Sequence, residues 1–379
     1  MTANLAEFIT LIEPHLPSLL AKPMVMDHVK AISKILPCTE GIVLECRLNR
    51  PDPSLDLSVC LVPASASYNY FTASPDKPYS LPPLVYHHPL WSQLRALFNA
   101  CAGENTFLKE AVSNLWLEFD INGTQTAVPI PGFFIDIHDV DLVQRSQSMP
   151  ERAATKLKLA EESFRIALGR EMPTMYRQNL QRCLELLPPN TVVAYFGNML
   201  SRQSDVIRFA VRGLSPSQLR VYLQAVDWQG DAKQLLQYVD GVANIADQIV
   251  FNFEVGHTFS SRVDIECLIK PYRSAYWSEL LTFFVETDYC TEEKRQALLA
   301  WPGYSHKNNC QSVWPASFNT ADSFFAGAYQ PVFQRTINHL KLIYRPQQPI
   351  ETKAYLCLQQ QWLDLTNKRK MSQPSYSNA

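Results

Sequence analysis

Apolar and polar residues alternate in short segments that occur in pairs along the chain. Such alternation is typical of strands with one buried face, and turn residues between the two segments of a pair predict a β-hairpin. Five pairs occur, at residues 41–63, 115–138, 192–214, 249–269 and 339–358. The turn of the second pair contains Asn122-Gly123, a strong hairpin signal. The sequence therefore predicts ten strands.

Between the hairpins, apolar residues recur with the spacing of amphipathic helices. Ser215-Pro216 joins a capping residue to a proline in the first turn, and Thr291 is followed by two glutamates that favour a helix N-terminus. The predicted helical segments are 88–102, 105–113, 151–187, 215–228, 231–246, 274–288 and 291–300, preceded by an N-terminal helix. The aromatic segment 323–333 reads as a core helix or as a cap on one barrel mouth. Two helices followed by two strands thus recur five times.

An open antiparallel sheet of ten short strands would leave two edges free to pair with other chains, and closure into a barrel removes both. We therefore expect an α+β fold of five repeated ααββ units that close a ten-stranded antiparallel β-barrel surrounded by helices. Residues 1–365 would form this single domain, and 366–379 a disordered tail. Two alternatives stay open: ordinary sheets whose polar face contacts solvent, and two α+β domains divided near residue 150.

The alternation also assigns each strand an outer and an inner face. In the first hairpin, Leu44 and Cys46 would face the helices, whereas Glu45 and Arg47 would face the lumen. The fourth and fifth hairpins place charged residues on the inner face in the same way. Charges that recur with strand period opposite a covered apolar face indicate a solvated lumen, which is the candidate site.

The charge balance argues against nucleic acid and membrane partners. Lys and Arg number 34 against 36 Asp and Glu, and no apolar run is long enough to span a bilayer. The nine cysteines are scattered and never spaced as Cys-x-x-Cys, which is typical of reduced thiols. The N-terminus lacks the features of a secretory signal. These observations favour a cytoplasmic protein, which we expect to be a monomer.

The sequence gives no reason to expect a metal or a cofactor. It lacks a Gly-rich phosphate loop, a His-Glu-x-x-His motif and a Gly-x-Ser-x-Gly motif. The segment DIHDVD at 136–141 contains metal-binding residue types, but alternating acids at a strand end are more typical of turns.

The first and last hairpins carry a resemblance to a known family. The segments VLECRLN, LSVCLVP and TKAYLCL resemble strands of the aromatic and peptide prenyltransferases of the dimethylallyltryptophan synthase type, whose barrels also consist of five helix-helix-strand-strand units. The resemblance implies that Glu45 takes the place of a glutamate that contacts an indole nitrogen. It also implies that Lys353 and Tyr355 hold a prenyl diphosphate.

Several positions differ from that family. Ser58 stands where the family has an arginine, and the strand GFFIDI lacks the Lys-x-Tyr pair. Arg208 and Arg212 are a partial match on the third hairpin. Asp264 and Glu266 stand where the family prefers Lys, Gln or Tyr.

The inner face supplies the candidate site residues. We predict Glu45 and Glu266 as catalytic groups, which would act as bases if burial raises their pKa. The predicted substrate-binding residues are Arg47, Trp116, Arg208, Arg212, Arg262, Asp264, His339, Lys341, Lys353 and Tyr355. Cations would stabilise a leaving diphosphate, and aromatic faces would shield an allylic cation.

The first functional hypothesis is transfer of an allylic prenyl group to an aromatic or peptide acceptor inside the barrel, so the expected partners are such an acceptor and an allylic diphosphate. The second is a peptide-modifying or hydrolytic maturation enzyme on the same barrel that has lost diphosphate chemistry. The third is a noncatalytic barrel that binds a peptide or a small ligand. The arrangement of charges in the lumen distinguishes them, because a cation patch beside aromatic walls favours prenyl transfer.

Overall fold

The structure is a computed structural model. It describes residues 5–50, 53–63, 65–77, 80–104, 106–121, 128–138, 148–202, 204, 206–310, 312–315 and 329–364. The predicted Asn122-Gly123 turn and the predicted tail at 366–379 lie outside these residues.

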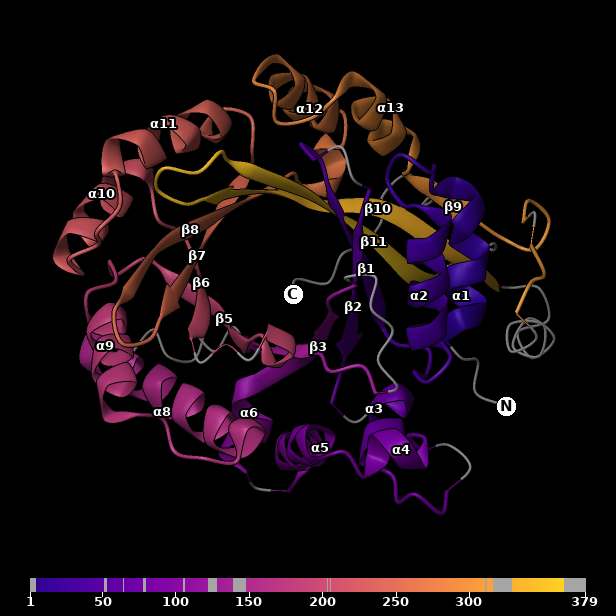
Figure 1. Cartoon of the computed structure of the whole chain (residues 1–379), viewed down its shortest axis with the longest axis horizontal. Helices are drawn as coiled ribbons and strands as arrows, with labels where there is room; N and C mark the ends of the chain where they lie inside the picture. The colour runs from indigo at the N-terminus through magenta and orange to yellow at the C-terminus, as the bar shows by residue number, and fades with distance from the viewer. Residues whose placement is uncertain are drawn as a thin grey trace.

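The strands form one closed antiparallel barrel, viewed along its axis in Figure 1. Strand β11 pairs with both β1 and β10, so the last hairpin joins the first hairpin to the fourth. The barrel strands are β1 (Gly41–Arg47), β2 (Leu55–Leu61), β3 (Val112–Phe119), β4 (Gly132–Ile137), β5 (Val192–Asn198), β6 (Ile207–Arg212), β7 (Gln248–Val255), β8 (Phe259–Leu268), β10 (Tyr329–Tyr344) and β11 (Glu351–Asp364). This closure confirms the predicted ten-stranded barrel.

Helices surround the barrel on its outer side (Figure 1). They are α1 (Leu5–Ile12), α2 (Pro23–Ser33), α3 (Ala66–Thr72), α4 (Pro83–Tyr86), α5 (Pro89–Ala102), α6 (Phe107–Ala111), α8 (Met149–Leu168), α9 (Thr174–Glu185), α10 (Pro216–Ala225), α11 (Ala232–Ala243), α12 (Tyr276–Glu286) and α13 (Glu292–Ala300). The predicted caps are present, because Ser215 accepts a hydrogen bond from the Gln218 amide and Thr291 accepts one from the Lys294 amide. The second unit departs from the repeat because it contains α3 to α6 before its hairpin.

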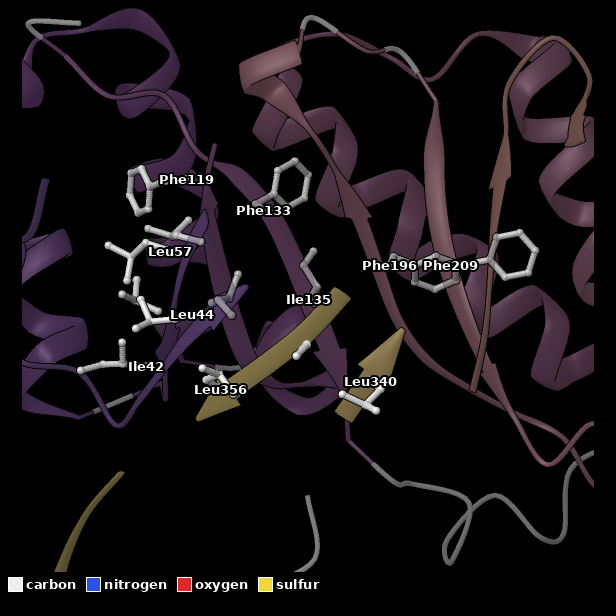
Figure 2. Packing of buried hydrophobic residues seen from close by; sticks show 14 of the residues in the cluster. Ile42, Leu44, Leu57, Phe119, Phe133, Ile135, Phe196, Phe209, Leu340 and Leu356 are labelled. Carbon is white, nitrogen blue, oxygen red and sulfur yellow. The ribbon is translucent and has the colours of Figure 1, made fainter. Parts of the chain in front are cut away.

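The hydrophobic core lies between the barrel and its helices. Figure 2 shows part of this layer, including Leu44, Leu57 and Phe119 from three neighbouring strands. Val263, Ile265 and other predicted outward residues belong to the same buried cluster. The predicted inner and outer faces are therefore confirmed, and the solvated-sheet alternative is excluded. Division of the chain into domains stays a prediction.

The last hairpin is longer than predicted. Strand β10 already begins at Tyr329, so the end of the aromatic segment 323–333 is a strand, and the helix expected there is wrong for residues 329–333. The added strand β9 (Gly303–Ser305) pairs with this first half of β10. The far half of β11 has no alternating apolar pattern because residues 359–364 are partly exposed on both faces. That missing pattern explains why the sequence underestimated the hairpin.

Gly197 allows one aromatic wall of the lumen to pack against β5. A Cβ at this position would lie 2.0 Å from Phe134 Cδ1 and 2.8 Å from the Phe133 carbonyl oxygen. We expect Gly197→Ala to lower the free energy of unfolding by about 1–3 kcal/mol, because the ring and the backbone must both shift. Urea denaturation would measure this change.

Gly41→Ala is the matched control for this variant. Its added Cβ would meet Cys60 Cβ at 3.4 Å, an ordinary contact distance, in another lumen-facing strand position. Equal losses of stability in the two variants would show that the close approach at Gly197 is not the cause.

Candidate functional site

All twelve predicted site residues lie on strands of the barrel and on its inner face. They come from β1 (Glu45, Arg47), β3 (Trp116), β6 (Arg208, Arg212), β8 (Arg262, Asp264, Glu266), β10 (His339, Lys341) and β11 (Lys353, Tyr355). Most of them form contact networks in the lumen. The sequence could not predict these contacts, because the partners come from distant hairpins.

Glu45 is the centre of the first network. Its side chain is almost fully buried and accepts hydrogen bonds from Lys353 Nζ and from the Tyr355 hydroxyl. The pairing of β1 with β11 places Glu45 opposite Tyr355, which brings both partners within reach. The three residues that the family resemblance singled out are therefore in direct contact.

Glu266 is the centre of a second network with the same residue types. It accepts hydrogen bonds from Lys341 Nζ at 2.9 Å and from the Tyr195 hydroxyl at 3.0 Å. His339 Nε2 lies 3.9 Å from Glu266 Oε1. Each predicted catalytic carboxylate thus binds one lysine and one tyrosine.

The two lysines meet between these networks. Lys341 and Lys353 are cross-strand neighbours in the pairing of β10 with β11. Arg47 is the neighbour of Lys353 on its other side, in β1. We call Arg47, Arg262, Lys341 and Lys353 the cation tier.

Arg47, Arg208 and Arg262 are bound to carboxylates. Arg262 pairs with Asp264 at 2.7 Å and with Glu254 at 3.1 Å, and Arg208 pairs with the same Glu254 at 2.8 Å. Arg47 pairs with Asp56 at 3.0 Å. An anionic ligand would therefore have to displace carboxylates from cations that are already in place.

Aromatic rings occupy the next level of the lumen. His339 stacks on Tyr355 with ring centroids 3.9 Å apart, and Trp116 packs against the small cluster that contains Tyr355. Phe134 is the cross-strand neighbour of Trp116 and contacts Tyr195 edge to face. We call Trp116, Phe134, Tyr195, His339 and Tyr355 the aromatic tier. Trp116 also donates a hydrogen bond to Asp136, near which Arg212 lies.

A cavity of about 1170 Å³ opens at the barrel mouth beside the cation tier. Its charged lining consists of Lys22, Arg47, Arg50, Arg202, Arg262, Arg345 and Lys353, against Asp56, Asp120 and Glu351. The apolar part of the lining includes Ile32 of α2, Ile35 just after this helix and Ile130 of the second hairpin. Cations thus outnumber carboxylates seven to three at this mouth.

Glu45 and Glu266 were predicted to act as bases if burial raises their pKa, and the pKa of neither is raised. Burial on its own would raise the pKa of Glu45, but the charge and hydrogen bond of Lys353 outweigh burial and hold that pKa well below its usual range. Burial and Lys341 oppose each other in the same way at Glu266, whose pKa is lowered. Both carboxylates are therefore ionised, and they are weak bases.

Several lumen residues were missed in the sequence. Burial and the charge of Glu45 raise the pKa of Asp56 to about 8, although Arg47 opposes this shift. Arg202 follows β5 in a short 3₁₀ turn and binds Asp120 at the mouth. The inner-face position of Asp56 in the alternation could have found it, whereas Arg202 lies in a turn without a pattern.

Comparisons with known proteins agree with this architecture. The crystal structure of the prenyltransferase PriB in its apo form matches with a TM-score of 0.52 at 12% identity, over 93% of this chain and 96% of that chain. A 6-dimethylallyl tryptophan synthase matches with a TM-score of 0.51 at 10% identity, over 94% and 97%. The chain has the aromatic prenyltransferase fold.

The prenyltransferase fold confirms the resemblance inferred from the first and last hairpins. The sequence itself has diverged: no family model matches it, and a sequence search of characterised proteins found no match. In the described part of the chain, no helix is long and apolar enough to cross a membrane.

Proposed function

We propose that the protein transfers an allylic prenyl group from its diphosphate to an aromatic acceptor held in the barrel lumen. The observation that carries this proposal is the cation tier directly next to the aromatic tier. Lys341 and Lys353 lie one inner-face position from His339 and Tyr355 on the same two strands. The matched solved structures are a prenyltransferase and a 6-dimethylallyl tryptophan synthase, which agrees with this assignment.

The two tiers suit the two halves of the reaction. Fixed cations stabilise the negative charge on the departing diphosphate, which lowers the barrier to cleavage of the allylic C–O bond. Aromatic faces stabilise the allylic cation and keep water away from it. The ionised carboxylate of Glu45 would then stabilise the positive charge that develops on the acceptor ring.

Asp56 offers a way to release Arg47 for the diphosphate. Because its pKa is raised to about 8, Asp56 holds a proton most of the time at pH 7. A protonated Asp56 would bind Arg47 more weakly, and the guanidinium would turn to the anionic ligand. The ion pairs of the mouth are therefore compatible with diphosphate binding.

The cavity size favours an acceptor larger than a free amino acid. Small-molecule pockets measure about 300–1000 Å³, and the mouth cavity exceeds this range at about 1170 Å³. Its apolar wall along α2 would contact residues that flank an aromatic side chain in a peptide. We therefore include peptides among the proposed acceptors.

The hydrolytic alternative with Glu45 and Glu266 as its two carboxyl groups has less support. Acid–base hydrolysis by two carboxyl groups requires one of them to hold a proton near neutral pH. Glu45 and Glu266 both have a lowered pKa and are both bound to a lysine.

The test is a transfer assay. The protein would be incubated with dimethylallyl or geranyl diphosphate, together with free tryptophan and a panel of Trp- and Tyr-containing peptides, and the products would be analysed by mass spectrometry. We expect a mass increase of one prenyl group on an aromatic acceptor. No adduct with any donor, together with no measurable diphosphate binding, would refute the proposal, and cleaved peptides would support the hydrolytic alternative.

A further inference from the structure

His339 has one ring nitrogen with a hydrogen-bond partner and one without. Its Nδ1 lies 2.6 Å from Asn338 Oδ1, an oxygen that can accept a hydrogen bond but cannot donate one. The neutral tautomer that satisfies this contact has its proton on Nδ1, and its Nε2 then carries a lone pair. Nε2 is buried and has no hydrogen-bond partner in the described part of the chain.

An unpaired buried acceptor is costly, so its presence at a candidate site indicates a ligand. A second polar atom of the same region, Asn252 Nδ2, is also buried without a partner. Asn252 joins this region because its side-chain amide contacts the Tyr195 hydroxyl, whose single proton is donated to Glu266. His339 Nε2 is therefore the unused acceptor beside Glu266.

The surroundings of His339 favour a neutral ring that can gain a proton during a reaction. Burial lowers the pKa of His339 to about 4, and Lys341 acts in the same direction, whereas Glu266 and Glu45 oppose the shift. Tyr355 is a further titratable neighbour, and its ring stacks on the imidazole. At neutral pH the ring is therefore uncharged, with the Nε2 lone pair not held by a lysine as the Glu45 and Glu266 carboxylates are. The lowered pKa makes it a weak base, but a prenylated ring cation is acidic enough to give its proton to a weak base.

We propose that His339 is the base that removes the proton from the acceptor ring after prenyl transfer, an inference that rests on the proposed function. The C–O bond of the allylic diphosphate breaks and its electron pair leaves with the diphosphate. An acceptor ring carbon then bonds to the allylic carbon, and its C–H proton passes to His339 Nε2. The C–H electron pair restores the aromatic ring.

Glu266 acts as a positioning residue for this step. Its carboxylate oxygen lies 3.9 Å from Nε2, which is close enough to stabilise the imidazolium once it forms. Lys341 and Tyr195 hold that carboxylate in place. This arrangement separates the duties of the two predicted catalytic carboxylates: Glu45 faces the developing ring charge, and Glu266 supports the base.

A kinetic isotope experiment tests the role of His339. Transfer of the dimethylallyl group to L-tryptophan and to tryptophan deuterated at every indole carbon would be compared in the wild type and in His339→Gln. The wild type should show an isotope effect near unity, because bond formation limits its rate. The variant should be about 10²-fold slower and show a normal primary effect, because proton removal becomes limiting.

Controls separate this role from a structural one. His257→Gln changes a histidine that packs on Tyr176 away from the lumen and should retain wild-type kinetics. Added imidazole should restore part of the activity of His339→Ala. A loss of rate without an isotope effect and without rescue would overturn the proposal.

Nitrogen NMR of the histidine rings tests the proposal without any activity. At pH 7, His339 should appear as the neutral tautomer with its proton on Nδ1, and a proton on Nε2 would overturn the proposal.

The results that would contradict the proposed function differ from those that would contradict the role of His339. Absence of transfer by the wild type counts against the proposed function, whereas wild-type rates in His339→Gln count against His339 alone.

Discussion

Replacement of Lys353 by methionine is expected to lower the free energy of unfolding by about 3–5 kcal/mol, because Glu45 would remain as a buried charge without its cation. The exposed fraction of Glu45 is only 1%. Hydration cannot compensate for the lost partner at this depth. Urea denaturation followed by circular dichroism would measure the change.

Two further variants define the cause of this loss. The double variant Lys353→Met with Glu45→Gln removes both charges and should regain most of the stability. Lys30→Met breaks an ion pair with Glu13 of 2.7 Å whose side chains are 28% and 42% exposed. Such a pair contributes about 1 kcal/mol or less. A loss in Lys353→Met no larger than that in Lys30→Met would contradict the interpretation of Glu45 as a buried, paired charge.

Glu45→Gln is expected to lower kcat for prenyl transfer by about 10²–10³-fold, a typical effect of removing one electrostatic stabiliser of a transition state. Glutamine keeps the size of the side chain and can still accept the hydrogen bond from Tyr355, but it cannot balance positive charge on the acceptor ring. Steady-state kinetics with dimethylallyl diphosphate and the best acceptor from the panel would measure the change.

Donor binding provides the control for that variant. Calorimetric titration with a nonreactive thiolo analogue of the donor should give affinities for Glu45→Gln and the wild type within a few-fold of each other. A large loss of donor affinity would show instead that Glu45 holds the cation tier in the position that binds the donor. Unchanged kcat would remove Glu45 from the mechanism.

Local pattern was sufficient to predict the strands and their faces. The alternation of Leu44, Glu45 and Cys46 assigns Glu45 to the lumen because neighbouring residues of a strand point to opposite sides. The same rule places Lys353 and Tyr355 inside on β11. The fold class followed from five repetitions of this pattern together with the need to protect sheet edges.

The local alternation of residues could not predict which distant strands pair, or in which register. Glu45 meets Tyr355 only because β1 and β11 pair in one particular register, and a shift by one residue would have changed every partner. The pKa of Glu45 depends on that register, since Lys353 provides the opposing charge. Sequence reasoning could therefore name the catalytic candidates but could not decide whether burial or pairing controls their protonation.

The lumen charges illustrate the same limit. Along the sequence, the inner face carries nearly as many acids as bases, so a diphosphate could bind only where the cations cluster. In three dimensions Arg202 and Arg345 enter from turns and add to the cations of the mouth, where Ile32 forms part of the apolar lining. Turns have no periodic signal, so their contribution appears only once the barrel is closed.

The pairing of β1 with β11 also determines when the site can form during synthesis. Glu45 is separated from Lys353 by 308 positions and from Tyr355 by 310. During synthesis on the ribosome, the carboxylate emerges long before its two partners. The nascent chain therefore carries an unmatched first strand until β11 has been synthesised. A chain that ended before residue 351 would keep four hairpins yet have neither a closed lumen nor a place to bind substrate.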